Sequence, residues 1–281
     1  MTTNNMQKQD KLAVFFPGIG YTCDRSLLYY TAVLMKELGY EVVPVAYTGF
    51  PENVKGDAQK MRECYSIAQD RAAEILRDIN FSDYDDIVFV GKSIGTVVAL
   101  TIANQFDLTV RSVLYTPLLE TFDLLPMGTG TNTSAVVFHG TSDQWARTPQ
   151  IIAACDNHDV PLYLVGKANH SLETGDLNDD LRILKKTMQT VRGFLTMDRE
   201  LYNSEMHVNT YGNYYDDEED MYDDTDDLFD VDPSERDYYD DEALEMEETL
   251  DDFLIANDEN PFDPDARFDA MSDPFGFGDD D

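Results

Sequence analysis

Short apolar runs alternate with longer segments of helical periodicity through residues 12–195. The apolar runs, which predict strands, cover residues 12–16, 41–47, 86–90, 110–115, 134–140 and 160–166. The segments between them, which predict helices, are 26–39, 57–79, the stretch after Ser93, a stretch near 146–157, and 177–195. Strands and helices that alternate in this way predict a mostly parallel sheet with helices on both faces, a three-layer α/β fold.

Chemically useful residues follow several of these predicted strands. Ligands of such sheets bind beyond the carboxyl ends of the strands. PGIGYTCDRS follows the first strand, GKSIG the third, HGTSDQW the fifth and KANHSLE the sixth. Ser93, Asp143 and His170 therefore each come after a strand. They occur in the order Ser, Asp, His, which is the order of the α/β-hydrolase triad.

The segment GKSIG at residues 91–95 allows two interpretations. Its first three residues end the phosphate-loop pattern G-x-x-x-x-G-K-[ST], and the whole segment matches the G-x-S-x-G turn that exposes a serine nucleophile. A phosphate loop needs a glycine five positions before Gly91, where Asp86 stands, and residues 86–90 are an apolar run that suits a strand. The strand, the two glycines and the following helical segment favour the nucleophile turn.

Four segments resemble those of small α/β-hydrolases, particularly the dienelactone hydrolase-like group. PGIGYT is similar to their oxyanion loop, GKSIG to their nucleophile elbow, HGTSDQW to their acid turn and NHSLE to their histidine turn. The resemblance covers about residues 11–197. It implies an α/β-hydrolase fold of about six mostly parallel strands, without the first two strands of the family. Residues 116–133, between two predicted strands, are too few for an inserted helical lid.

Ser93, Asp143 and His170 are the candidate catalytic residues. A serine hydroxyl needs a base to remove its proton, an imidazole can serve as that base, and a carboxylate can orient the imidazole. Each residue considered alone also has a structural interpretation. His170 is then a loop histidine without a role, and Asp143 is a turn or helix-capping residue.

The candidate oxyanion hole is formed by backbone N–H groups. One comes from Ile94, and the other from Ile19 or Gly20. The loop PGIGYT departs from the H-G-G-G form of the family, so both of these residues remain candidates.

Four side chains near these residues carry weaker signals. We expect Lys92 at the rim of the site and His139 packed or hydrogen-bonded at a strand end. Trp145 fits buried packing better than lining of the pocket. Cys23, near the oxyanion loop, suggests inhibition by thiol reagents without a catalytic role. Cys23, Cys64 and Cys155 are widely spaced, which predicts free thiols and neither a metal nor a cofactor.

Charge divides the chain into unequal parts. Of the net charge of −36, residues 1–200 carry −7 and residues 201–281 carry −29. We therefore predict a flexible N-terminus (1–10), a hydrolase domain (11–200) and an acidic, largely disordered tail (201–281). The negative charge argues against nucleic-acid binding. No apolar run approaches the ~20 residues of a membrane span, and the first residues lack a signal-peptide pattern, which predicts a cytoplasmic protein.

The tail leaves a second function open. Tyr, Phe, Leu and Met are interleaved with its acidic residues, and residues 233–256 begin with a Ser-x-x-Asp helix signal. This pattern is typical of segments that bind a protein partner, and a solubilising tail is the alternative. The sequence thus predicts a serine hydrolase of a small acyl substrate with an ester, thioester or related bond. The alternative is a non-catalytic hydrolase-fold scaffold that binds a partner through its tail.

Overall fold

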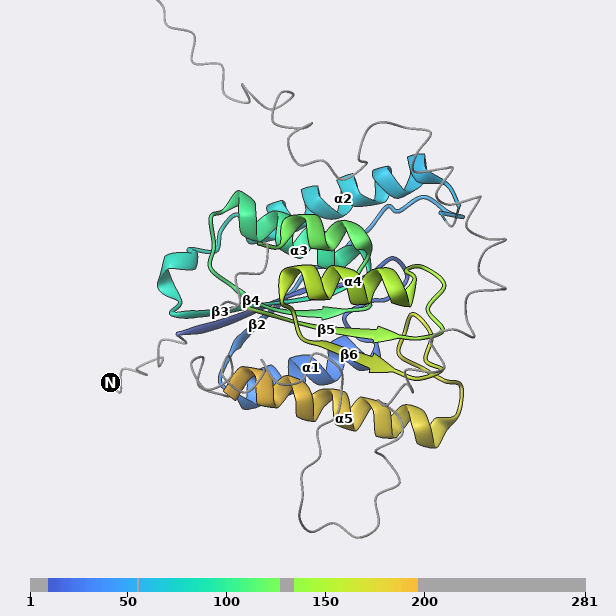
Figure 1. Cartoon of the computed structure of the whole chain (residues 1–281). Helices are drawn as coiled ribbons and strands as arrows, with labels where there is room; N and C mark the ends of the chain where they lie inside the picture. The colour runs from blue at the N-terminus through green and yellow to red at the C-terminus, as the bar shows by residue number, and fades with distance from the viewer. Residues whose placement is uncertain (1–9, 55, 127–133, 197–281) are drawn as a thin grey trace, which may run out of the picture.

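The computed structural model describes residues 10–54, 56–126 and 134–196 (Figure 1). The predictions for the N-terminus before residue 10 and for the acidic tail, including its disorder and its partner, lie outside these residues. Among the described helices, none has the length and apolar character needed to cross a membrane.

Six strands form one sheet in the order β2-β1-β3-β4-β5-β6, and every pairing is parallel. The bounds are β1 Lys11–Phe16, β2 Glu41–Pro44, β3 Asp86–Lys92, β4 Arg111–Tyr115, β5 Ala135–Gly140 and β6 Leu162–Val165. The predicted number and direction of the strands are therefore confirmed. The second strand ends earlier than predicted, at Pro44, although the Val45 N–H still donates to the carbonyl oxygen of Phe15 over 2.8 Å. Pro44 is tolerated because β2 is an edge strand, where the N–H that proline lacks would face away from β1.

Helices cover both faces of the sheet (Figure 1). Helices α1 (Ser26–Glu37) and α5 (Leu177–Thr196) lie on one face, and α2 (Ala58–Leu76), α3 (Ile94–Gln105) and α4 (Thr148–His158) lie on the other. Two short 3-10 helices lie in the connections: η1 (Phe81–Asp83) between α2 and β3, and η2 (Leu119–Leu124) between β4 and β5. The predicted helices are confirmed with shifts of a few residues at their ends. Between β4 and β5 the described residues contain only η2, as expected without a lid, and 127–133 lie outside the description.

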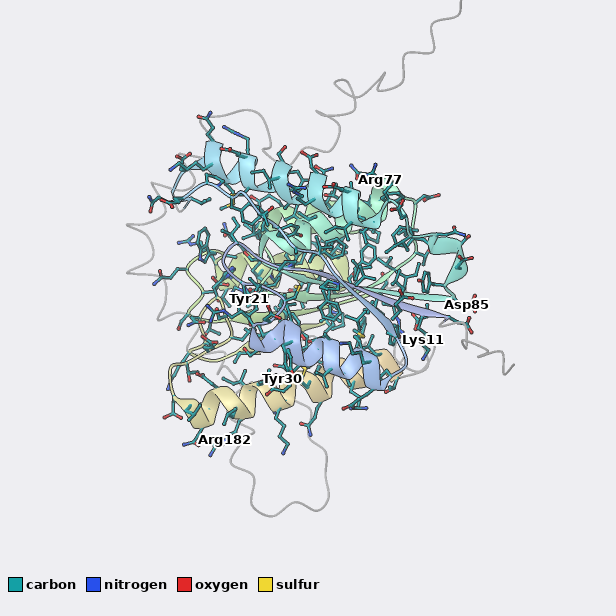
Figure 2. All side chains as sticks on the ribbon, turned by 180° about the vertical axis from the view of Figure 1, so that it is seen from behind. Lys11, Tyr21, Tyr30, Arg77, Asp85 and Arg182 are labelled. Atoms are coloured by element: carbon teal, nitrogen blue, oxygen red, sulfur yellow. The ribbon has the colours of Figure 1, made fainter. Side chains whose placement is uncertain are left out.

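The direction in which successive strands are added to the sheet reverses between β1 and β3. This reversal locates the edge of the sheet where ligands are expected. The chain passes from β1 outward to β2 and then returns to β3 on the other side of β1. The loops after β1 and β3 therefore leave the sheet in opposite directions, and this topology predicts a crevice at their carboxyl ends. Figure 2 shows Tyr21, in the loop after β1, at the end of the sheet opposite Lys11 and Asp85.

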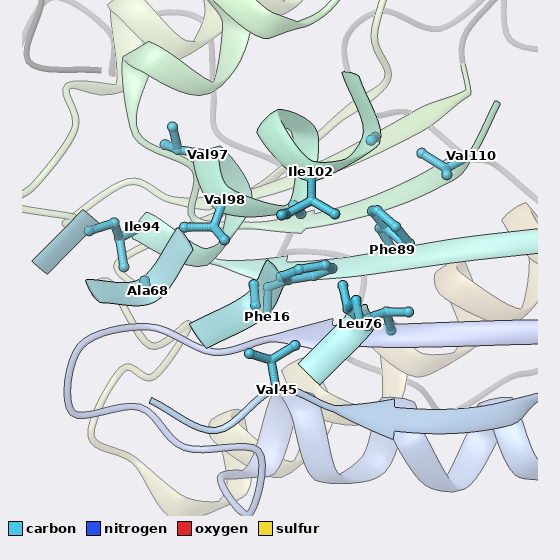
Figure 3. Packing of buried hydrophobic residues seen from close by; sticks show 14 of the residues in the cluster. Phe16, Val45, Ala68, Leu76, Phe89, Ile94, Val97, Val98, Ile102 and Val110 are labelled. Carbon is cyan, nitrogen blue, oxygen red and sulfur yellow. The ribbon is translucent and has the colours of Figure 1, made fainter. Parts of the chain in front are cut away.

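Alternating side chains of the central strands build two separate cores. In β1, Leu12, Val14 and Phe16 pack toward α2 and α3, whereas Ala13 and Phe15 pack toward α1 and α5. Figure 3 shows Phe16 and Phe89 together with Leu76, Ile102 and other members of the first core. Burying each such phenylalanine stabilises the fold by about 1.5–3 kcal/mol. The two cores hold β1 and β3, and with them the crevice, in place.

Helix α3 approaches β1 so closely that one of its residues must be glycine. A Cβ built on Gly95 would overlap the carbonyl oxygen of Phe16, whereas a Cβ on Gly193 in α5 would meet nothing. We predict that Gly95→Ala lowers the free energy of unfolding by about 3 kcal/mol, because the backbone must shift. Gly193→Ala, the matched control, should raise it by about 0.5–1 kcal/mol, since alanine favours a helix. Urea denaturation measures both, and equal effects would contradict this packing.

Candidate active site

Ser93 lies in a strained turn between β3 and α3. Its backbone has φ 55° and ψ −128°, a conformation that L-residues rarely adopt and that costs about 1–3 kcal/mol. Glycines make the turn possible: a Cβ on Gly91 would lie 2.6 Å from the Cα of Thr96, and a Cβ on Gly18 would lie 3.3 Å from the Cβ of Ser93. Residues 86–92 form a strand, so the phosphate-loop interpretation is excluded.

Hydrogen bonds on both sides hold this turn. The Ser93 N–H donates to the carbonyl oxygen of Tyr115, at the end of β4, over 3.0 Å. The Ser93 carbonyl oxygen accepts from the Thr96 N–H at 2.8 Å and from the Thr96 hydroxyl at 2.7 Å. The Ser93 side chain remains partly exposed. The strained serine is therefore fixed by its backbone while its hydroxyl stays accessible.

Asp143 and His170 form a buried hydrogen-bonded pair. The His170 Nδ1 lies 2.7 Å from Asp143 Oδ2, and the Trp145 N–H donates to Asp143 Oδ1 over 2.8 Å. The Asp143 side chain is fully buried and that of His170 is 19% exposed. The two residues follow β5 and β6, as the sequence predicts. The carboxylate thus orients the imidazole, with Nδ1 as the donor.

Burial and neighbouring charges set the protonation of this pair. Burial raises the pKa of Asp143, but the His170 hydrogen bond and charge and the Trp145 N–H outweigh it, so the pKa lies below its ordinary value. Burial lowers the pKa of His170, the hydrogen bond with Asp143 raises it, and the charge of Lys92 lowers it again, with a net decrease. The aspartate is therefore ionised and the histidine neutral at neutral pH.

The free nitrogen of His170 has no partner among the described residues. His170 Nε2 is buried without a hydrogen bond, so it does not bond to the Ser93 hydroxyl here. The two residues are nevertheless tied to the same strand end. Tyr115 accepts from Ser93, and the next residue, Thr116, donates its hydroxyl to the His170 carbonyl oxygen over 3.0 Å. The supporting role of Thr116 had no signal in the sequence beyond its position after a strand.

The candidate oxyanion donors lie on either side of Ser93. Ile94 is the first residue of α3, where an N–H has no acceptor within the helix. In the loop after β1, Gly18 and Tyr21 exchange hydrogen bonds of 3.1 and 3.3 Å, which leaves Ile19 and Gly20 at the tip. Gly18 lies against Ser93, so the base of this loop borders the candidate nucleophile. Both Ile19 and Gly20 remain candidates for the second donor.

Lys92 does not lie at the rim, and this prediction is wrong. Its side chain is 1% exposed, because Lys92 ends β3 and faces the core rather than the solvent.

His139 is also fully buried, and its Nε2 lies 3.2 Å from the Thr148 hydroxyl, as expected for a strand-end histidine. Its Nδ1, however, lies 3.7 Å from Asp143 Oδ2. Sequence reasoning missed this proximity to Asp143, because the residues between the two form a strand end and a turn rather than a helix.

Trp145 is half-buried, and its contacts agree both with packing in the core and with a place beside the pocket. Its ring packs against the first core and lies 5.8 Å from the ring of His170. All three cysteines are free thiols, and the described residues contain no group of three metal-ligating side chains.

Comparisons with known proteins add structural neighbours only. No protein-family model matches the chain, and no curated protein matches it either. Among solved structures, the chain is similar to an α/β serine hydrolase homologue from Coxiella burnetii (15% identity, TM-score 0.44, covering 67% of this chain and 88% of that one). It is also similar to an esterase from Pyrococcus furiosus (13% identity, TM-score 0.48, covering 66% of this chain and 82% of that one). A third similar structure is an α/β serine hydrolase without a lid from Xanthomonas campestris (14% identity, TM-score 0.42, covering 69% of this chain and 87% of that one).

These similarities are too low to indicate a substrate or a mechanism. The assignment of an α/β-hydrolase fold rests on the parallel strand order, the helices on both faces and the strand–turn–helix at Ser93.

We predict that Asp143→Asn lowers the pKa of His170 further. The hydrogen bond and the charge of Asp143 both raise this pKa, and the amide removes the charge. NMR titration of the four histidines, with His170→Gln for assignment, measures the change. Asp107→Asn, an exposed aspartate after α3, is the control and should leave His170 unchanged. A rise of the His170 pKa in Asp143→Asn would contradict the pairing.

Cys23 should react slowly with alkylating reagents, so inhibition by thiol reagents, which the sequence suggests, should be slow at neutral pH. Burial, together with the charge of Asp24, raises the pKa of Cys23 to about 12. Because the thiolate is the reactive form, alkylation by iodoacetamide near neutral pH should be on the order of a thousand-fold slower than for a free thiol. Mass spectrometry of time points measures the rate at Cys23, and a rate close to that of glutathione would refute this.

Proposed function

We propose that this protein is a serine hydrolase that cleaves an ester, thioester or related acyl bond of a small substrate. One observation carries the proposal: the strained turn at Ser93 and a buried Asp143–His170 pair, whose Nε2 has no partner among the described residues, are both hydrogen-bonded to the end of β4. A buried nitrogen without a partner is costly unless another group uses it. The Ser93 hydroxyl, when a substrate is bound, is the group that would bond to this nitrogen.

The reaction uses each residue in one role. His170 Nε2 takes the proton of the Ser93 hydroxyl as Oγ bonds to the carbonyl carbon of the substrate, and the carbonyl electrons move to its oxygen. When the tetrahedral intermediate collapses, the bond to the leaving group breaks and His170 gives that group the proton. Water then repeats both steps on the acyl-enzyme, releasing the acid and free Ser93. Asp143 stabilises the imidazolium in each half.

The oxyanion is held by backbone donors. The Ile94 N–H at the start of α3 is the first, and Ile19 or Gly20 supplies the second. Each donor of this kind contributes about 3 kcal/mol to stabilisation of the transition state. Since all these groups belong to the chain itself, the proposed reaction requires no cofactor and no metal.

The surroundings suggest a substrate and a compartment. The described part of the connection between β4 and β5 contains only η2, so we expect an open pocket that favours short acyl esters over long-chain emulsified ones. Free Cys23, Cys64 and Cys155 are typical of a reducing compartment, and we therefore propose the cytoplasm.

The decisive test is Ser93→Ala. Without its nucleophile the protein should lose covalent labelling by a fluorophosphonate, in which the serine oxygen displaces fluoride from phosphorus. Turnover of activated esters such as p-nitrophenyl acetate should fall on the order of a million-fold. His170→Ala should cost a similar amount and add little to Ser93→Ala, since the residues act as a unit. Unfolding by urea checks that the fold is intact.

Ser142→Ala, which removes an exposed serine next to the candidate acid, is the matched control and should keep both labelling and turnover. Full hydrolysis by Ser93→Ala would refute the proposed nucleophile. A wild-type protein that neither reacts with fluorophosphonate nor hydrolyses any activated ester would leave the scaffold alternative, in which the tail binds a partner.

A further inference from the structure

Lys92 is buried immediately before Ser93. It is 1% exposed and among the largest fully buried side chains. Alternation along β3 puts its side chain on the same face as Val88 and Val90, toward α1 and α5. Its Nζ lies 5.1 Å from the centroid of the Tyr21 ring, in the range of a cation–π contact. The ammonium group therefore lies beneath the crevice.

The Tyr21 ring, in the loop after β1, contacts this ammonium. In the sheet Lys92 lies opposite Tyr115, and the next residue, Thr116, donates to the carbonyl oxygen of His170 over 3.0 Å, so the loop after β6 reaches the same strand ends. Asp143, after β5, and Glu173 and His170, after β6, interact electrostatically with Lys92. The ion pairs among the described residues do not include Lys92. A buried cation without an ion-pair partner destabilises a fold. Stability therefore does not account for a lysine at this position.

We infer that Lys92 is a positioning residue whose buried positive charge opposes protonation of His170 and so keeps the base ready beside Ser93. This inference rests on the proposed function. Lys92 lies on the core face of β3. It acts through His170 and does not contact the substrate. Its charge is effective because charges interact more strongly in a buried environment of low dielectric constant than in water.

The two groups titrate against each other. Burial lowers the pKa of Lys92 to about 7, although Asp143 and Glu173 raise it. Lys92 in turn lowers the pKa of His170. As the pH falls below neutral, Lys92 gains its charge first and then resists the uptake of a proton by His170. His139 takes no part, because burial lowers its pKa to about 4. The base therefore stays neutral at lower pH than it would without the lysine.

A purely structural lysine would behave differently. Its folded pKa is below its ordinary value of 10.5, so the folded protein binds fewer protons than the unfolded chain. Its contribution to stability is then lost as the pH falls from about 10.5 through about 7. Lys92→Met, similar in size and uncharged, should raise the Tm at neutral pH. If Lys92 only fills space, Lys92→Met should change nothing besides the Tm. If Lys92 acts on His170, Lys92→Met should also change the pH dependence of kcat/KM.

The experiment compares the pH profiles of kcat/KM for p-nitrophenyl acetate in wild type, Lys92→Met, Lys92→Arg and Lys167→Met. Lys167 is an exposed lysine just after β6, so Lys167→Met removes the same charge from the same edge in solvent. For each protein, the rate at about pH 5.5 is divided by its own plateau at about pH 8. Lys92→Met should reduce this ratio about 3- to 10-fold, whereas Lys92→Arg, which keeps the charge, and Lys167→Met should match wild type.

NMR titration of His170 separates this inference from the proposed function. In Lys92→Met the midpoint of the His170 titration should move to higher pH, whether or not the protein is active. If wild type is inactive and the midpoint moves, the proposed function fails and the coupling stands. If hydrolysis occurs and Lys92→Met changes neither the ratio nor the midpoint, the inference is overturned and the proposed function remains. Should Lys92→Met not fold, Lys92→Gln provides the same comparison.

Discussion

The close contact of backbone with backbone around residues 91–96 is the constraint on which the site depends. Gly91, Gly95 and Gly18 lie where a Cβ would meet main-chain atoms or the Cβ of Ser93. This packing lets α3 begin directly against β1 and forces Ser93 into a conformation with φ 55°. A strained residue persists only when its surroundings over-determine it. The two cores on either side of β1 and β3 supply that rigidity.

The end of β4 joins the two halves of the site. Tyr115 accepts a hydrogen bond from the Ser93 N–H, and Thr116, itself in the left-handed region with φ 40°, donates to the carbonyl of His170. Ser93 and His170 come from segments far apart in the chain, yet both are hydrogen-bonded to consecutive residues at the end of one central strand. Small displacements of that strand end would therefore move both groups together, which preserves their relative geometry.

The sequence was sufficient for the elements, because they follow from periodicity. Apolar runs of strand length gave the parallel sheet, and the carboxyl ends of its strands then predicted one edge for Ser93, Asp143 and His170. The pattern could not reveal which way a polar side chain at a strand end points. Lys92 was expected in solvent because lysine usually is, but its position in β3 turns it into the core. The proximity of His139 to Asp143 depends on the path of the turn between them, which periodicity does not encode.

The distribution of buried polar groups is the strongest physical argument for function at this edge. At the opposite end of the sheet, Arg111 bonds to Asp86, Tyr40 and the carbonyl of Leu195, so its donors are satisfied. The buried side-chain atoms without a hydrogen-bond partner among the described residues include His170 Nε2 and His139 Nδ1 at the carboxyl edge, besides Tyr47 Oη and Thr187 Oγ1. Satisfied buried groups specify a fold, whereas unsatisfied ones reduce stability and call for another explanation. An unsatisfied imidazole nitrogen at the same sheet edge as a strained serine is what a site that binds a reacting, charge-developing substrate requires.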